Sequence, residues 1–178
     1  MLQMKIGLYA TISIFCLALF GCGDDTTTTE IMETENNSET PIITKKAIED
    51  FKFKDYVLSE ESKEAILEWE NYKELAEQIS YLKKTDLSFF NGDKNDLKEF
   101  IEDFKTSIPK QLLVNPIISR TAIIETMLYR LNENLTIENI DKKDKLQSVK
   151  EVLVAFSNLN YHINKKLEHD YYNKIQPE

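Results

Sequence analysis

Residues 117–135 read IISRTAIIETMLYRLNENL. Six positions recur at steps of four, three, four, three and four residues: Ile117, Thr121, Ile124, Leu128, Leu131 and Leu135. An α-helix brings residues at this spacing to one face, where they pack against a neighbouring helix. The preceding Asn115-Pro116 is typical of a helix start, with a capping side chain and then proline in the first helical position. The stretch therefore predicts a long amphipathic helix.

A second long helix is predicted from about Lys142 to Tyr172 by the same spacing. Its apolar seam comprises Leu146, Val149, Leu153, Phe156, Asn160, Ile163 and Leu167. Asn160 stands where an apolar residue is expected. The favoured interpretation is an edge position wetted by solvent, and the alternative is a buried amide that fixes helix register.

Weaker patterns precede these two helices. Ser59, followed by two glutamates, predicts a capped helix that runs to about Lys84. Asp96 and Glu99 resemble a capping box that opens a helix ending before Pro109. Residues 44–58 are mixed, because a short helix near 46–51 gives way to a period-two alternation that suits an extended stretch over the helices or a short strand.

The glycine content favours an all-α fold. Of four glycines, only Gly92 lies beyond residue 23, whereas all-β domains need many tight turns and use more glycine in them. Helices with short connections pack as antiparallel neighbours. We therefore expect residues 43–175 to form an antiparallel helical bundle of three to five helices, behind a signal peptide and a disordered tether.

The chain is acidic, with a net charge of -9. Nucleic-acid affinity comes mainly from clustered Lys and Arg, and the sequence contains no run of such residues. We therefore expect no nucleic-acid partner. Electrostatic attachment to anionic lipid is disfavoured for the same reason.

Residues 1–21 are typical of a secretory signal peptide. Lys5 is followed by an uncharged apolar run from Ile6 to Phe20. This run is short for a membrane-spanning helix, which needs roughly 20 apolar residues. We expect it to be removed.

The run ends in Leu19-Phe20-Gly21-Cys22, which resembles the lipobox of bacterial lipoproteins. The resemblance implies cleavage before Cys22 and attachment of diacylglycerol to its thiol, so that the lipid bilayer is the first partner. Phe20 departs from the pattern, which usually has a smaller residue there. Cys16 would leave with the signal peptide, and acylation explains the single cysteine that remains. Two or three acyl chains anchor a protein stably.

Residues 22–42 predict a lipidated, disordered, acidic tether. They contain six acids, no base and almost no apolar residue, so they cannot bury enough surface to offset the entropy of ordering. Acids soon after the cysteine resemble the export signal of uncharacterised surface lipoproteins of the Bacteroidetes type. Gly23, rather than aspartate, follows Cys22, which favours the outer over the inner membrane and makes surface exposure an expectation.

Few residues of the helical region suggest chemistry. His162 and His169 are seven apart and share a predicted exposed face, where a metal site would need acids from another helix. Met127 on the facing helix is the one residue that offers a haem pairing with a histidine. Arg120 either pairs with Glu125 or a neighbouring helix, or extends into solvent, which is favoured. We expect no catalytic, metal or cofactor residue, and no enzyme.

Two functional hypotheses follow. The first is an envelope lipoprotein whose helical domain interacts with another envelope protein or has a structural role. The alternative is a helical carrier of a hydrophobic ligand or haem.

Overall fold

The structure is a computed structural model that describes residues 43–175. The predicted signal peptide, Cys22 and the tether lie outside the described residues. Within them there are helices and no strands, so the all-α prediction is confirmed. The elements are α2 (Lys45–Glu49), α3 (Glu60–Ala65), α4 (Glu70–Leu82), α5 (Lys94–Thr106), the 3-10 helix η1 (Lys110–Leu112), α6 (Asn115–Thr136) and α7 (Lys142–Ile175).

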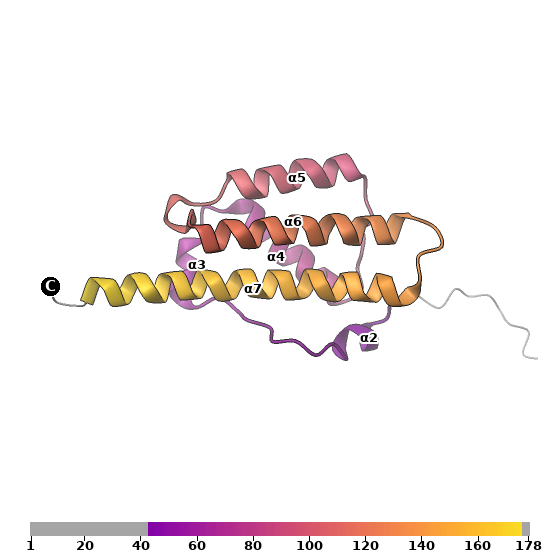
Figure 1. The fold of residues 1–178 in the computed structure, drawn as a ribbon, viewed down its shortest axis with the longest axis horizontal. Helices are drawn as coiled ribbons and strands as arrows, with labels where there is room; N and C mark the ends of the chain where they lie inside the picture. The colour runs from indigo at the N-terminus through magenta and orange to yellow at the C-terminus, as the bar shows by residue number, and fades with distance from the viewer. Residues whose placement is uncertain (1–42, 176–178) are drawn as a thin grey trace, which may run out of the picture. The chain divides into compact units, whose positions relative to one another are not determined.

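The two long helices predicted from the apolar seams are both present. α6 and α7 lie side by side and form the most extensive helix contact of the described region (Figure 1). The α6 seam is buried at Ile117, Thr121, Ile124, Leu128 and Leu131. On α7, the buried seam positions are Val149, Leu153, Phe156, Asn160 and Ile163. The seam spacing therefore identified the faces that form the core.

α5 packs against both α6 and α4, and the single tryptophan lies at the start of α4 (Figure 1). The Trp69 side chain is 0% exposed, and its Nε1 donates a 2.9 Å hydrogen bond to the carbonyl oxygen of Phe104. The two aromatic rings are stacked with their centroids 5.1 Å apart. Burial of a large aromatic side chain whose one polar atom has a partner stabilises the contact between α4 and α5.

The predicted helix from Ser59 to about Lys84 is wrong in one respect, because it is two helices. Ser59 caps α3 as predicted, with its Oγ accepting a hydrogen bond from the Ser62 amide. The chain then leaves the helix at Ile66 and resumes it after Trp69. The break turns both Ile66 and Trp69 into the core, and the side chain of Gln111 donates to the carbonyl oxygen of Ala65 at the end of α3. Tertiary burial thus overrides local helix propensity here.

Two predicted helix starts are also wrong by a few residues. The cap of α5 is Asp93, three residues before the predicted cap Asp96, because Asp93 Oδ1 accepts a 2.7 Å hydrogen bond from the Asn95 amide. Asp96 lies in the first turn, where its charge faces the positive end of the helix dipole. In α6, Val114 occupies the capping position, Asn115 is already helical, and Pro116 follows in the first turn.

Residues 51–59 connect α2 to α3 without helix or strand, and we call this segment the strap. The strap passes along α7 (Figure 1). Phe51 and Phe53 pack against the core whereas Lys52 and Lys54 are exposed, which explains the period-two alternation, and Leu58 also packs against the core. The prediction of an extended stretch is confirmed, and the alternative of a short strand is wrong.

Candidate functional site

A polar network on α7 joins distant parts of the described chain. α7 presents Ser157, Asn160 and Asn164 to the strap at helical spacing. Ser157 Oγ accepts a 2.8 Å hydrogen bond from the Tyr56 amide and donates a 2.6 Å bond to the carbonyl oxygen of Lys54. One side chain of the helix therefore satisfies two backbone groups of the strap.

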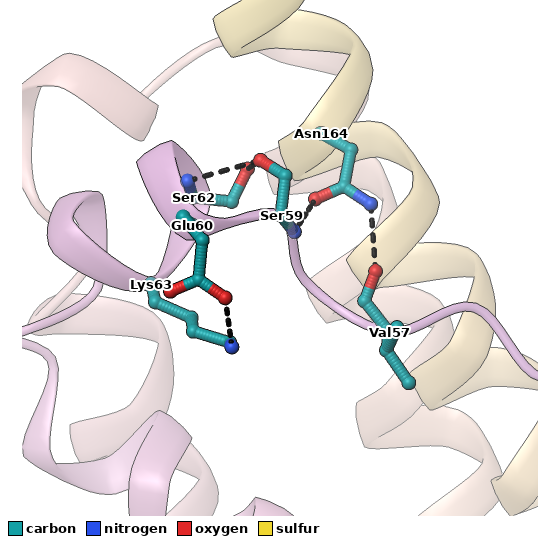
Figure 2. A network of polar contacts seen from close by, with 6 residues as sticks. All are labelled: Val57, Ser59, Glu60, Ser62, Lys63 and Asn164. Carbon is teal, nitrogen blue, oxygen red and sulfur yellow. Dashed lines mark hydrogen bonds and ion pairs between the residues drawn. The ribbon is translucent and has the colours of Figure 1, made fainter.

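Asn164 repeats this arrangement about two turns further along α7. Its Oδ1 accepts a 2.9 Å hydrogen bond from the Ser59 amide, and its Nδ2 donates a 2.8 Å bond to the carbonyl oxygen of Val57 (Figure 2). Ser59 is also the cap of α3, through its contact with Ser62 (Figure 2). The end of the strap and the beginning of α3 are thus fixed to the same turn of α7.

Asn160 completes the network from a buried position. Asn160 is only 6% exposed. Its Nδ2 donates a 2.9 Å hydrogen bond to the carbonyl oxygen of Tyr56, and its Oδ1 accepts a 2.6 Å hydrogen bond from the Tyr72 hydroxyl. The favoured interpretation of Asn160 as a solvent-wetted edge position is therefore wrong. Burial raises the pKa of Tyr72 well above its usual value, so this hydroxyl remains a donor.

This network supports structure and offers no reaction chemistry. Its members are neutral amides and hydroxyls whose donors and acceptors are paired, and no buried side-chain polar atom of the described residues lacks a partner. The side chains that hold the strap, those of Ser157, Asn160 and Asn164, include no thiol, histidine or carboxylate that would activate a nucleophile. We therefore assign the network to positioning of the strap.

Asn132 on α6 is a second buried amide, and the sequence patterns did not single it out. Its Nδ2 donates to the carbonyl oxygens of Phe90 and Gly92, at 2.9 and 3.0 Å, which fixes the turn before α5. Its position four residues after Leu128 places it on the buried face, and that spacing is the signal that was available.

The two histidines line one open groove beside the start of α6. The groove has a volume of about 460 Å³ and is lined by Val114, Pro116, His162, Lys165, Lys166, His169 and Asp170. His169 is exposed as predicted, whereas His162 is half-buried, so the prediction of an exposed face is wrong for His162. Burial lowers the pKa of His162, and the nearby positive charge of Arg120 lowers it further.

The structure separates the other candidates. Met127 lines a different groove from the histidines, with Val154 and Asn158, so a haem pairing has no geometric support. Arg120 is half-buried, and Glu125, its proposed partner, instead forms a 2.6 Å ion pair with Lys105. Within residues 43–175, no group of three or more His, Cys, Asp or Glu side chains is placed to hold a metal ion.

The last turns of α7 carry three exposed large side chains close together in the sequence. Tyr171, Tyr172 and Ile175 are 63%, 54% and 55% exposed. The two tyrosines line a groove of about 360 Å³ together with Ser59, Glu61, Asn164, Leu167 and Glu168. The pKa of Glu61 lies below its usual value, mainly because its own backbone amide donates a hydrogen bond to the carboxylate and secondly because the Ser59 hydroxyl does so. We call this surface the tyrosine groove.

Comparison of the chain with protein-family models, with curated proteins and with solved structures finds no match. None of the helices between residues 43 and 175 combines the length and the apolar content needed to cross a membrane.

Proposed function

We propose that the protein is a lipoprotein of the bacterial cell envelope, anchored through acylated Cys22, whose helical domain binds another envelope protein at the tyrosine groove. The single observation that carries the binding role is the groove itself. Solvent-exposed tyrosines beside a hollow are typical of protein interfaces, where aromatic side chains dominate the binding energy. The anchor is supported by the Leu19-Phe20-Gly21-Cys22 motif.

The charges around the groove define the chemistry of the partner. Glu61 and Glu168 line the groove, and Glu60 and Glu64 lie on the same short helix as Glu61. Glu168 pairs with Lys165 and Glu60 with Lys63, whereas Glu61 and Glu64 form no ion pair with a described residue. Electrostatic complementarity favours a partner segment that presents Lys or Arg beside an apolar side chain. We therefore expect the apolar residue to lie on the tyrosines and the basic residue to face Glu61.

The proposed scaffold for this groove is an antiparallel helical bundle. Arg130 on α6 pairs with Glu151 on α7 at 2.8 Å, and four residues later Asn134 donates to the carbonyl oxygen of Asp144. A later residue of α6 thus contacts an earlier residue of α7. The contacts between α5 and α6 follow the same order. Lys105 near the end of α5 pairs with Glu125, whereas Gly92 just before α5 contacts the later Asn132. These pairings support opposite directions for neighbouring helices.

The anchor is tested by expressing the full chain and its Cys22→Ala variant in a bacterial host. We expect the unchanged chain to enter the detergent phase, with an N-terminal peptide that begins at Cys22 and carries acyl chains by mass spectrometry. The Cys22→Ala variant should keep residues 1–21. An unmodified N-terminal peptide from the unchanged chain would refute the anchor. Protease treatment of intact cells then shows whether the domain faces outward.

The groove is tested by placing a photo-crosslinking amino acid at Tyr172 in cells. Position Tyr81, which is also an exposed tyrosine, serves as the matched control. We expect one discrete product at Tyr172 and none at Tyr81, with a crosslinked partner peptide that contains both basic and apolar residues. Charge reversal at Glu61 (Glu61→Lys) should abolish the product. Equal crosslinking at both positions, or an acidic partner peptide, would contradict the proposal.

A further inference from the structure

The charges of the described region are unevenly distributed along the chain. Residues 43–54 and 141–150 together carry eight lysines and four acids, which gives a net charge of +4. The remaining described residues, 55–140 and 151–175, have a net charge of −7. The acidity of the whole chain therefore conceals a basic portion that is divided between two distant stretches of sequence.

The fold brings these two stretches together. α2 packs against α7, and the strap begins beside the first turns of α7 (Figure 1). An open groove of about 520 Å³ lies where they meet. We call its lining the lysine face, which consists of Phe51, Lys142, Lys143, Leu146, Gln147 and Lys150.

The lysine face combines unpaired positive charge with a partly exposed apolar floor. Lys142 and Lys143 are exposed, and none of the three lysines forms an ion pair with another described residue. Phe51 and Leu146 are half-buried against the core. Lysines around an aromatic residue match a surface of phosphate headgroups, which attract the ammonium groups and accommodate the ring at the level of the headgroups.

The position of the lysine face in the chain suggests which surface it meets. The described chain begins at Ile43, shortly before α2, so the polypeptide enters the domain at the end where the lysine face lies. The tyrosine groove lies toward the other end of α7, because Leu146 and Glu168 are separated by 22 helical residues, or about 33 Å. The chain that leads to the proposed anchor therefore joins the domain at its basic end.

We propose that the lysine face docks on anionic phospholipid headgroups of the membrane that carries the anchor, and this inference rests on the proposed function. The net negative charge of the chain does not oppose it. At physiological ionic strength, exposed charges are screened over about 8 Å, so headgroups in contact with the lysine face sense its lysines more than the distant acids. Docking in this orientation leaves the tyrosine groove directed away from the bilayer.

The test uses the acylated full-length protein in vesicles of phosphatidylcholine alone or of equimolar phosphatidylcholine and phosphatidylglycerol. A cysteine introduced at Gln147 carries a fluorophore, and Glu168→Cys on the same helix is the matched control. Headgroup-linked nitroxide lipid is the quencher. We expect quenching at Gln147 only in vesicles that contain phosphatidylglycerol, reversal by added salt, and no quenching at Glu168.

Charge variants make the test specific. The combined variant Lys142→Gln, Lys143→Gln and Lys150→Gln should weaken docking, lowering its equilibrium constant roughly 100-fold. Lys94→Gln, Lys98→Gln and Lys110→Gln, which remove three exposed lysines elsewhere, should have little effect.

Three results would overturn the inference, and they can be told apart. Protein that fails to float with either vesicle would refute the anchor together with this inference. Flotation with equal quenching at Gln147 in both vesicles, or with none, would refute the docking surface alone. Protection of Gln147 in native envelope membranes but not in lipid vesicles would assign the lysine face to a protein partner instead.

Discussion

The hydroxyl of Tyr72 on α4 donates a 2.6 Å hydrogen bond to Oδ1 of Asn160 on α7, and both residues are buried. The same amide donates to the carbonyl oxygen of Tyr56 through its Nδ2. Asn160 therefore connects two helices and the strap through one side chain. Because its carbonyl and amino groups have separate partners, the contact specifies one alignment of the three segments.

Replacement of Tyr72 by phenylalanine should destabilise the domain by about 1–3 kcal/mol, because Asn160 Oδ1 would lose its partner in a buried position. Tyr161→Phe is the matched control. Tyr161 is half-buried on α7, and its hydroxyl has no hydrogen bond to a described residue. Urea unfolding of both variants measures the difference. Equal losses in the two would show that the Tyr72 hydroxyl contributes nothing specific.

The domain should lose stability in alkaline solution partly through Tyr72. Burial raises its folded-state pKa above the ordinary value of 10.0, so at higher pH the unfolded chain releases the proton first. This contribution is fully present below pH 10 and is lost as the pH rises from there toward the folded-state pKa. As the pH rises above 10, the free energy of unfolding should therefore fall less steeply for Tyr72→Phe than for the unchanged chain. Parallel curves would contradict this prediction.

Ser157→Ala should cost about 1–3 kcal/mol and loosen the strap, because the Tyr56 amide and the Lys54 carbonyl both lose their partner. Ser148→Ala is the control on the same helix. Ser148 is equally buried, but its Oγ donates only to the carbonyl oxygen of Lys145 one turn earlier. Amide hydrogen exchange at Tyr56 should accelerate in Ser157→Ala and remain slow in Ser148→Ala.

Arg120→Gln should raise the pKa of His162 toward its ordinary value of 6.5 without restoring it, since burial is the larger cause of the shift. A lowered pKa means that the unfolded chain binds the proton first, so stability is lost as the pH falls through 6.5 toward the folded-state pKa. Arg120→Gln should reduce the stability that the domain loses as the pH falls. The histidine signals in an NMR titration report the pKa, and Arg130→Gln, which removes a cation paired with Glu151, should leave it unchanged.

Apolar spacing predicted the long helices well because burial of one face is a property of the sequence pattern itself. Ile124 on α6 and Leu153 on α7 are buried where the spacing placed them. Helix ends were less predictable. Asp93 and Asp96 are both acceptable caps, and only the packing of the turn before α5 decides between them. The break before Trp69 was also unpredictable, because no glycine or proline marks it in the sequence and only packing against the core produces it.

Polar positions were harder still, because burial of an amide depends on partners that are far away in the chain. Asn160 stood out on the seam, yet its partners Tyr56 and Tyr72 are 104 and 88 residues distant. The lysine face has the same origin, since Phe51 and Lys142 are neighbours only after folding. Composition reports a sum of charges, and only the fold determines how they are separated.

The strap also has a consequence for the order of events during synthesis. Its hydrogen bonds join Tyr56 to Ser157 and Ser59 to Asn164, across 101 and 105 residues. A chain made from its N-terminus cannot form them until the final helix has emerged from the ribosome, so closure of the strap is a late step. Until that step, the apolar side of residues 51–58 stays uncovered and available to chaperones. The strap is thus synthesised well before α7, the helix that holds it in place.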